Sequence, residues 1–167
     1  MVIRSLLYPN KWPPSNDVNR VDAFLPSDNV TELRTTKNEL SVWLADTKED
    51  IDDAIIAMVL NKDKPCKIVG LLMDEQELKS IQINVANNEK GIALGADESI
   101  LLKHRNLIDL DFWRLGYLTQ YMIDLSKDSS RQVIYTKEEV TDLLNKNKGT
   151  RITTENVSDK LRNSLKW

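Results

Sequence analysis

The middle of the chain alternates between strand-type and helix-type patterns, and this alternation limits the possible folds more than any other feature. Residues 40–44 alternate and then stay apolar, as a strand does. Thr47 and Asp50 have the spacing of a capping box, although Asp replaces the usual Glu or Gln. The next apolar residues have helical spacing: Ile51, Ala54, Ile55, Met58 and Val59. The run 67–73 is almost wholly apolar, which predicts a strand covered on both faces.

The alternation continues beyond this strand. Asp74 and Glu77 indicate the start of a short helix, and residues 81–85 alternate as a third strand. A strand, a helix and a strand of these lengths predict a right-handed βαβ crossover. Gly91 and Gly95 match neither nucleotide-binding glycine pattern, so they predict a turn.

The last part of the chain is mostly helical in pattern. A helix is expected over 110–125, a short strand over 133–135, and a helix from the Thr136–Glu139 capping box to Gly149. Another helix follows, capped by Thr153 or Thr154. This order resembles a winged helix-turn-helix, in which the second paired helix enters the DNA major groove. The chain departs from that family because it leaves no room for a wing hairpin. The resemblance implies DNA contacts from Asn156, Lys160, Arg162 and Lys166.

We therefore predict an α+β protein with a small βαβ-containing core and a C-terminal helical, winged-helix-like unit. The expected parts are a Pro-rich N-terminal arm (1–38), an α/β core (39–108) and the helical unit (109–167). The arm interleaves prolines with aromatic residues, among them Trp12 and Phe24. Aromatic residues on irregular segments are typical anchors of protein interfaces.

Composition narrows the class of protein. A chain of 167 residues suits one domain, and none of its apolar runs approaches the roughly 20 residues needed to cross a bilayer. Cys66 is the only cysteine, which fits a cytoplasmic protein and predicts a buried structural thiol. The net charge is −3, but residues 146–167 carry +4. This asymmetry predicts separate acidic and basic surfaces.

No group of residues predicts catalysis. His104 is the only histidine and has no nucleophile near it in sequence, so a surface or boundary position is expected. Asp46, Glu49, Asp50 and Asp53 could bind Mg²⁺, but acids in the first turn of a helix are favoured by its dipole without a metal. We expect no catalytic residue, metal or cofactor. Trp43 and Trp113 lie on periodic segments and are expected in the core.

The sequence thus favours a non-enzymatic accessory protein that binds another protein, as immunity proteins, antitoxins and defence components do. The high content of Asn and Lys suggests a bacterial origin. The expected partner contacts are Trp12, Phe24, Asp50 and Asp53. The alternative is a transcriptional regulator that binds DNA through residues 154–166. Assembly with further copies of the chain stays open.

Overall fold

A six-stranded antiparallel sheet forms the centre of the computed structural model, which describes residues 1–6, 33, 35–87 and 89–167. The strands are β1 (Val2–Leu6), β2 (Leu40–Leu44), β3 (Ile68–Met73), β4 (Asn84–Ala86), β5 (His104–Ile108) and β6 (Gln132–Tyr135). Their order across the sheet is β4-β5-β2-β1-β3-β6, and every neighbouring pair is antiparallel. The expected α+β class is confirmed.

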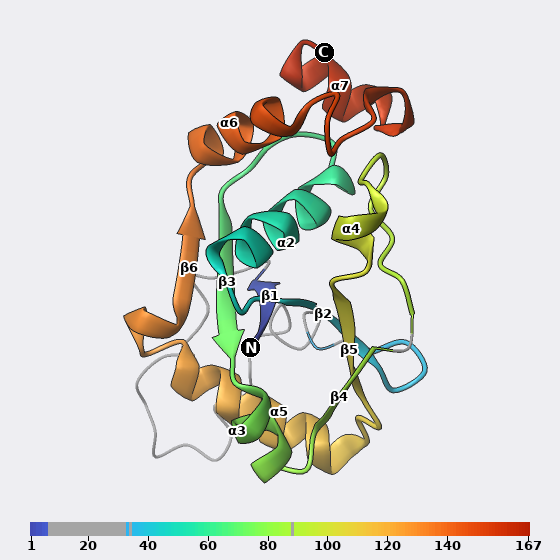
Figure 1. Cartoon of the computed structure of the whole chain (residues 1–167). Helices are drawn as coiled ribbons and strands as arrows, with labels where there is room; N and C mark the ends of the chain where they lie inside the picture. The colour runs from blue at the N-terminus through green and yellow to red at the C-terminus, as the bar shows by residue number, and fades with distance from the viewer. Residues whose placement is uncertain (7–32, 34, 88) are drawn as a thin grey trace.

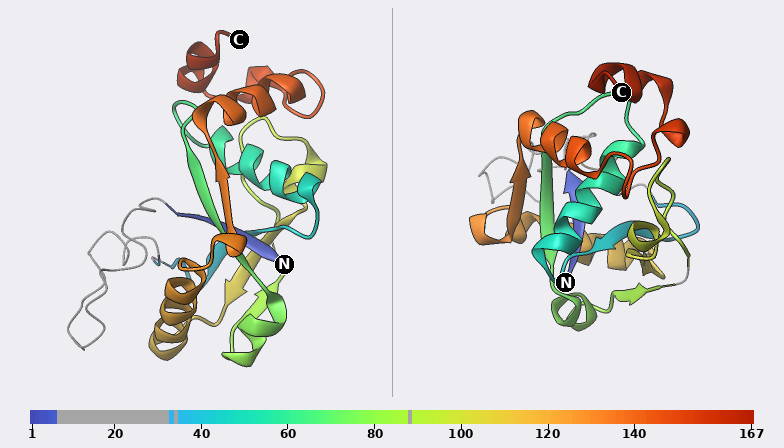
Figure 2. Two further views of the ribbon diagram at one scale, coloured as in Figure 1. Left: turned by 90° about the vertical axis from the view of Figure 1, so that its left-hand side faces the viewer. Right: turned by 45° about the horizontal axis from the view of Figure 1, so that its top comes forward.

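Helices cover both faces of this sheet (Figures 1 and 2). The α-helices are α2 (Lys48–Leu60), α3 (Glu75–Ser80), α4 (Glu98–Leu101), α5 (Phe112–Leu125), α6 (Lys137–Asn147) and α7 (Asp159–Leu165). The 3₁₀ turns η2 (Ser129–Arg131) and η3 (Thr154–Asn156) complete the elements of the described residues. None of these helices has the length and hydrophobicity of a membrane-spanning segment.

The alternation of side chains along each strand divides the core into two clusters. Val2 and Val42 pack in the cluster beside α5, whereas their neighbours Ile3 and Trp43 pack against α2. All four side chains are less than a tenth exposed. The sheet is therefore buried on both faces at its centre, as continuous apolar strands require.

Strand β1 corrects the predicted extent of the N-terminal arm. Its residues belong to the predicted range 1–38, yet β1 lies between β2 and β3 in the middle of the sheet. It pairs with β2 over only two residue pairs, Val2 with Leu44 and Ile3 with Trp43. Its partners are distant in sequence, so no local pattern announces the pairing. The arm residues 7–32, which include Trp12 and Phe24, lie outside the described residues.

The predicted crossover is also corrected. Strands β2 and β3 flank α2 and run in the same direction, but β1 separates them. Strands β3 and β4, for which the crossover was expected, are separated by β1, β2 and β5. Apolar periodicity predicts that strands share a sheet, but it carries no information on which strands are neighbours.

The range 109–167 shares the sheet and the core with the rest of the chain. Strand β6 pairs with β3, α6 packs on α2, and α5 covers the opposite face. The expected order of helix, strand, helix, turn and helix is present. The last helix is shorter than expected: η3 is followed by α7, which Ser158 caps by accepting a hydrogen bond from the Leu161 amide at 3.3 Å.

Candidate functional site

The exposed face of α5 is the most apolar surface of a helix in the described residues. Phe112 is 83% exposed and Trp113 is 72% exposed, with Tyr117 beside them at 49%. The two larger rings meet edge to face, with centroids 6.0 Å apart. Gly116 lies in the same face, and a Cβ added to it would meet no heavy atom within 4 Å. We call this group (Phe112, Trp113, Gly116 and Tyr117) the α5 aromatic face.

Helical spacing explains why this face is exposed. Leu118, Met122 and Leu125 occupy the buried stripe of α5 and pack on the sheet. The aromatic residues at 112, 113 and 117 lie on the other side of the helix, so the expectation that Trp113 is in the core is wrong. The apolar pattern of α5 is wider than one stripe. An apolar residue at helical spacing can therefore lie on the exposed side of its helix rather than in the core.

Carboxylates and basic side chains lie at both ends of the α5 aromatic face. Asp111 caps the helix by accepting a hydrogen bond from the Arg114 amide at 2.8 Å, and its carboxylate also pairs with the Arg114 side chain. Asp109 and Asp124 lie at the two ends of the helix and are exposed, and Asp124 pairs with Lys127 at 3.4 Å. The three carboxylates are therefore accompanied by two basic side chains, which leaves one excess acidic charge beside the aromatic face and a weak preference for a basic partner.

The acids at the start of α2 have a different role from the one expected. Asp53 is fully buried, and its Oδ2 lies 2.6 Å from Lys103 Nζ and 2.8 Å from Arg151 Nη2. Asp50 is 8% exposed and pairs with the same lysine at 2.7 Å. We call Asp50, Asp53, Lys103 and Arg151 the α2 ion cluster. These carboxylates join α2 to the segments around β5 and Arg151, so they are not the partner contacts that the sequence suggested.

The ion cluster shifts the pKa values of its members. Burial disfavours the charged form of Asp50, but hydrogen bonds from Lys103 and Thr47 outweigh burial and hold its pKa below the ordinary value. The hydrogen bond to Asp53 raises the pKa of Arg151 further. Thr47 completes the predicted capping box with Asp50, which is confirmed in both directions.

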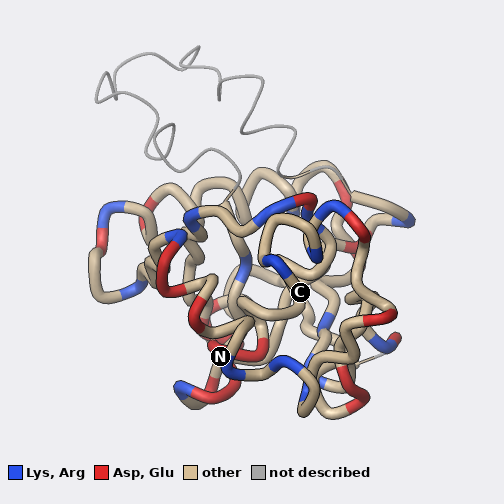
Figure 3. Tube along the Cα trace, turned by 90° about the horizontal axis from the view of Figure 1, so that it is seen from above, with Lys and Arg blue, Asp and Glu red and all other residues tan. Residues whose placement is uncertain are grey.

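The basic residues near the end of the chain are partly neutralised. Lys160 Nζ lies 2.9 Å from Asp63, and Arg162 pairs with Asp159. Asn156 and Lys166 are exposed, Lys166 in the left-handed conformation that ends α7. Figure 3 shows Lys and Arg interleaved with Asp and Glu along the trace. The charge asymmetry of the sequence is therefore reduced by contacts between its acidic and basic parts.

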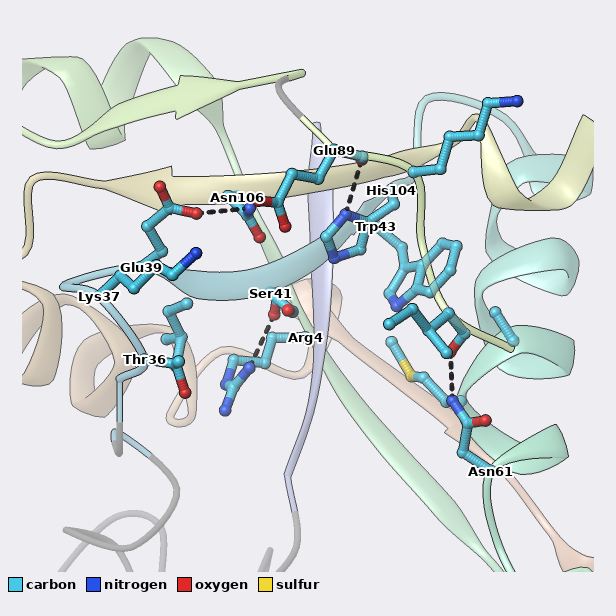
Figure 4. Close-up of a pocket in the computed structure, with 15 residues that line it drawn as sticks. Arg4, Thr36, Lys37, Glu39, Ser41, Trp43, Asn61, Glu89, His104 and Asn106 are labelled. Atoms are coloured by element: carbon cyan, nitrogen blue, oxygen red, sulfur yellow. Dashed lines mark hydrogen bonds between the residues drawn. The ribbon is translucent and has the colours of Figure 1, made fainter. Parts of the chain in front are cut away.

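A cavity of about 470 Å³ opens where β1 and β2 separate (Figure 4). Its inner wall holds Trp43 and His104, both only 7% exposed, with ring centroids 5.1 Å apart. His104 therefore lies at the boundary between the core and the cavity, one of the two positions expected for it, and not on the open surface. Gly91 packs on the indole of Trp43, because a Cβ there would lie 2.3 Å from Cη2. The remaining lining comes from the sheet, α2 and the loops: Arg4, Thr36, Lys37, Glu39, Leu40, Ser41, Ala57, Met58, Asn61, Glu89, Lys90, Ile92 and Asn106.

Polar contacts fix the floor of this cavity. Arg4 donates from Nη1 to the Ser41 carbonyl at 2.7 Å, across the gap between β1 and β2. The Asn106 amide donates to Glu39 at 2.7 Å. Sequence reasoning missed this site because β5, which supplies His104 and Asn106, was not predicted. The strand reads His-Arg-Asn-Leu-Ile, with its two apolar residues adjacent, so no alternating pattern indicated it.

A second hollow of about 590 Å³ lies between α2, β6 and α6. Its polar groups satisfy one another: the Tyr135 hydroxyl donates to Asp52, and Lys48 pairs with both. The Lys48 Nζ also lies 4.7 Å from the centre of the Tyr135 ring. Among the described residues, no three His, Cys, Asp or Glu side chains are grouped as metal ligands.

Comparisons of this chain with models of protein families, with curated proteins and with solved structures gave no match.

Proposed function

We propose that this chain is a cytoplasmic, non-enzymatic accessory protein that acts by binding another protein, in the manner of immunity proteins, antitoxins or defence components. The observation that carries the proposal is the α5 aromatic face. Large aromatic residues in the centre of an interface supply most of its binding free energy. In the isolated protein, the rings of Phe112 and Trp113 contribute no such free energy, because they are exposed to water.

The proposed partner has an apolar pocket whose surroundings are more basic than acidic. Asp109, Asp111 and Asp124 flank the aromatic face, two of them paired with Arg114 and Lys127, and the chain as a whole is acidic with a net charge of −3. Such complementarity accelerates encounter, while the buried rings slow dissociation. Trp12 and Phe24 of the predicted arm stay in the proposal as additional contacts.

A photo-crosslinking residue at position 113 would identify the partner, with the same residue at the 50% exposed Leu102 as the control. The purified partner would then be titrated against wild type, the double variant Phe112→Ser/Trp113→Ser and the control Leu102→Ser. We expect the double variant to bind roughly 30-fold more weakly or worse, since hot-spot residues contribute about 2 kcal/mol or more. Equal affinity for all three proteins would contradict the proposal.

The same experiment separates a foreign partner from a second copy of the chain. If the crosslinked product is a homodimer, and if the double variant abolishes a concentration-dependent dimer in sedimentation, the partner is the chain itself. The aromatic face would then be a symmetric interface.

DNA binding by the C-terminal helices is the second proposal. It rests on the order of elements from α5 to α7 and on the exposed Asn156 and Lys166. The ion pairs of Lys160 and Arg162 with acids weaken it. A salt titration with duplex DNA tests it: phosphate contacts require an affinity that falls steeply with salt, and an absence of binding at low salt contradicts it.

A further inference from the structure

Two polar groups on nearly buried side chains face the cavity of Figure 4 without a partner among the described residues. The first is the Nε1–H of Trp43, and the second is Nε2 of His104. The printed contacts of these rings involve other atoms: His104 Nδ1 lies 3.2 Å from the Glu89 carbonyl oxygen. Because a carbonyl oxygen can only accept, Nδ1 carries the hydrogen, and the Nε2 of the neutral ring is an acceptor.

Each side chain is only 7% exposed, so its ring nitrogen finds a partner in the occupant of the cavity, either water or a ligand. Indole N–H groups in protein interiors almost always donate a hydrogen bond, because an unpaired buried donor costs free energy. Neither nitrogen is sealed in the interior, since both stay accessible from the cavity. A donor and an acceptor on rings 5.1 Å apart are thus presented together to whatever fills this space.

The remaining lining defines the polarity of the occupant. Met58 and Ile92 give the cavity an apolar wall. Its lining carries three positive side chains (Arg4, Lys37 and Lys90) and two negative ones (Glu39 and Glu89), and the ion pair of Lys90 with Glu98 balances the remaining positive charge. Balanced charges favour neither an anion nor a cation. A volume of about 470 Å³ falls in the range of small-molecule sites, which is roughly 300–1,000 Å³.

We propose that this cavity binds a small neutral molecule with a carboxamide or lactam edge. The Trp43 Nε1–H donates to the carbonyl oxygen of the ligand, and His104 Nε2 accepts its N–H. The flat body of the ligand packs against Met58 and Ile92. This site is separate from the α5 aromatic face, so it does not depend on the proposed protein partner.

The test follows the indole N–H resonance of Trp43 in ¹H–¹⁵N spectra of the full chain, assigned by its loss in Trp43→Phe. The probes are nicotinamide for the carboxamide edge and uracil for the lactam edge. Their matched controls are N,N-dimethylnicotinamide and 1,3-dimethyluracil, which keep the carbonyl but lack the N–H. We expect a saturable shift with at least one probe and binding roughly tenfold weaker or worse for its methylated form, which is the loss of one hydrogen bond. The resonances of Trp113 and Trp167 should stay unchanged.

His104→Phe gives an independent arm, since phenylalanine keeps an aromatic ring beside Trp43 but has no acceptor. We expect this variant to bind the effective probe roughly tenfold more weakly. The methylated controls need no variant, so the test survives if this substitution unfolds the protein. The proposal is overturned if neither probe shifts the Trp43 resonance at concentrations on the order of 10 mM, which would leave water as the occupant. Equal binding of probes and methylated controls would also overturn it.

The source of the amide edge is settled by a further probe. N-acetylglutamine methylamide presents the same edge as part of a peptide. If it shifts the Trp43 resonance at lower concentration than nicotinamide or uracil, the cavity recognises a protein side chain, and the small-molecule proposal is wrong.

Discussion

Helices α2 and α5 are similar in length but differ in how the rest of the chain surrounds them. α2 runs over 13 residues, and eight of them are buried, including two aspartates. α5 runs over 14 residues, and only Leu118, Met122 and Leu125 are buried. The difference arises because α4, α6 and α7 lie around α2 on the same face of the sheet (Figures 1 and 2), whereas α5, among the described α-helices, contacts only α3 at its edge, where the Tyr121 hydroxyl donates to Glu77.

The same sequence pattern therefore has opposite outcomes, depending on whether other segments pack around the helix. Acids at a helix start are normally solvated, yet Asp50 and Asp53 form internal ion pairs because the segments with Lys103 and Arg151 lie beside α2. Aromatic residues at helical spacing are normally core, yet on α5 they are the residues that remain outside.

The largest effect is expected for Asp53→Ala. It leaves the charges of Lys103 and Arg151 half-buried with one partner fewer, which typically costs about 3–5 kcal/mol of unfolding free energy. Urea denaturation measures it, with Asp159→Ala as the matched control at an exposed ion pair, where about 0.5 kcal/mol or less is expected. A loss at Asp53 no larger than the control would show that the cluster is solvated.

The next effect concerns the buried stripe of α5. Leu118 is fully buried, so Leu118→Ala should cost roughly 2–5 kcal/mol through lost burial and a residual cavity. The measurement is the same urea titration. A much smaller loss would indicate that α5 is only weakly attached to the sheet.

The pH dependence of stability should include a contribution from the α2 ion cluster. The pKa of Asp50 is lowered in the folded state, so its contribution is present above the ordinary value of about 4 and is lost as the pH falls through the lower folded value. Asp50→Asn should therefore flatten the acid limb of a plot of stability against pH. An unchanged acid limb in this variant would assign acid sensitivity to other carboxylates.

The smallest effect is expected on the α5 aromatic face. Trp113→Ser should change the unfolding free energy by about 0.5 kcal/mol or less, because the side chain is already 72% exposed. Thermal and urea unfolding measure this change. If the loss of unfolding free energy is instead comparable with that of Leu118→Ala, Trp113 stabilises the chain itself, and the proposal that it binds a partner is contradicted.

Local chemistry was the part of this fold that the sequence could predict. The capping boxes of Thr47 and Thr136 and the cap at Asp74 are all present, because each involves residues within one turn. The neighbours of β1 and the strand β5 could not be predicted, because their stability comes from partners far away in sequence. The cavity followed the same rule: Trp43 and His104 are 61 positions apart and meet only through the pairing of β2 with β5.

The short pairing between β1 and β2 has a consequence for how the protein opens. The two residue pairs there join two three-stranded halves, β4-β5-β2 and β1-β3-β6. Helix α2 connects β2 to β3 and packs on Ile3 and Trp43, one from each half. The cohesion of the halves therefore depends more on side-chain packing beneath α2 than on the backbone ladder. In hydrogen exchange, we expect the amides along this seam to become labelled together when α2 detaches, ahead of those in the pairing of β1 with β3.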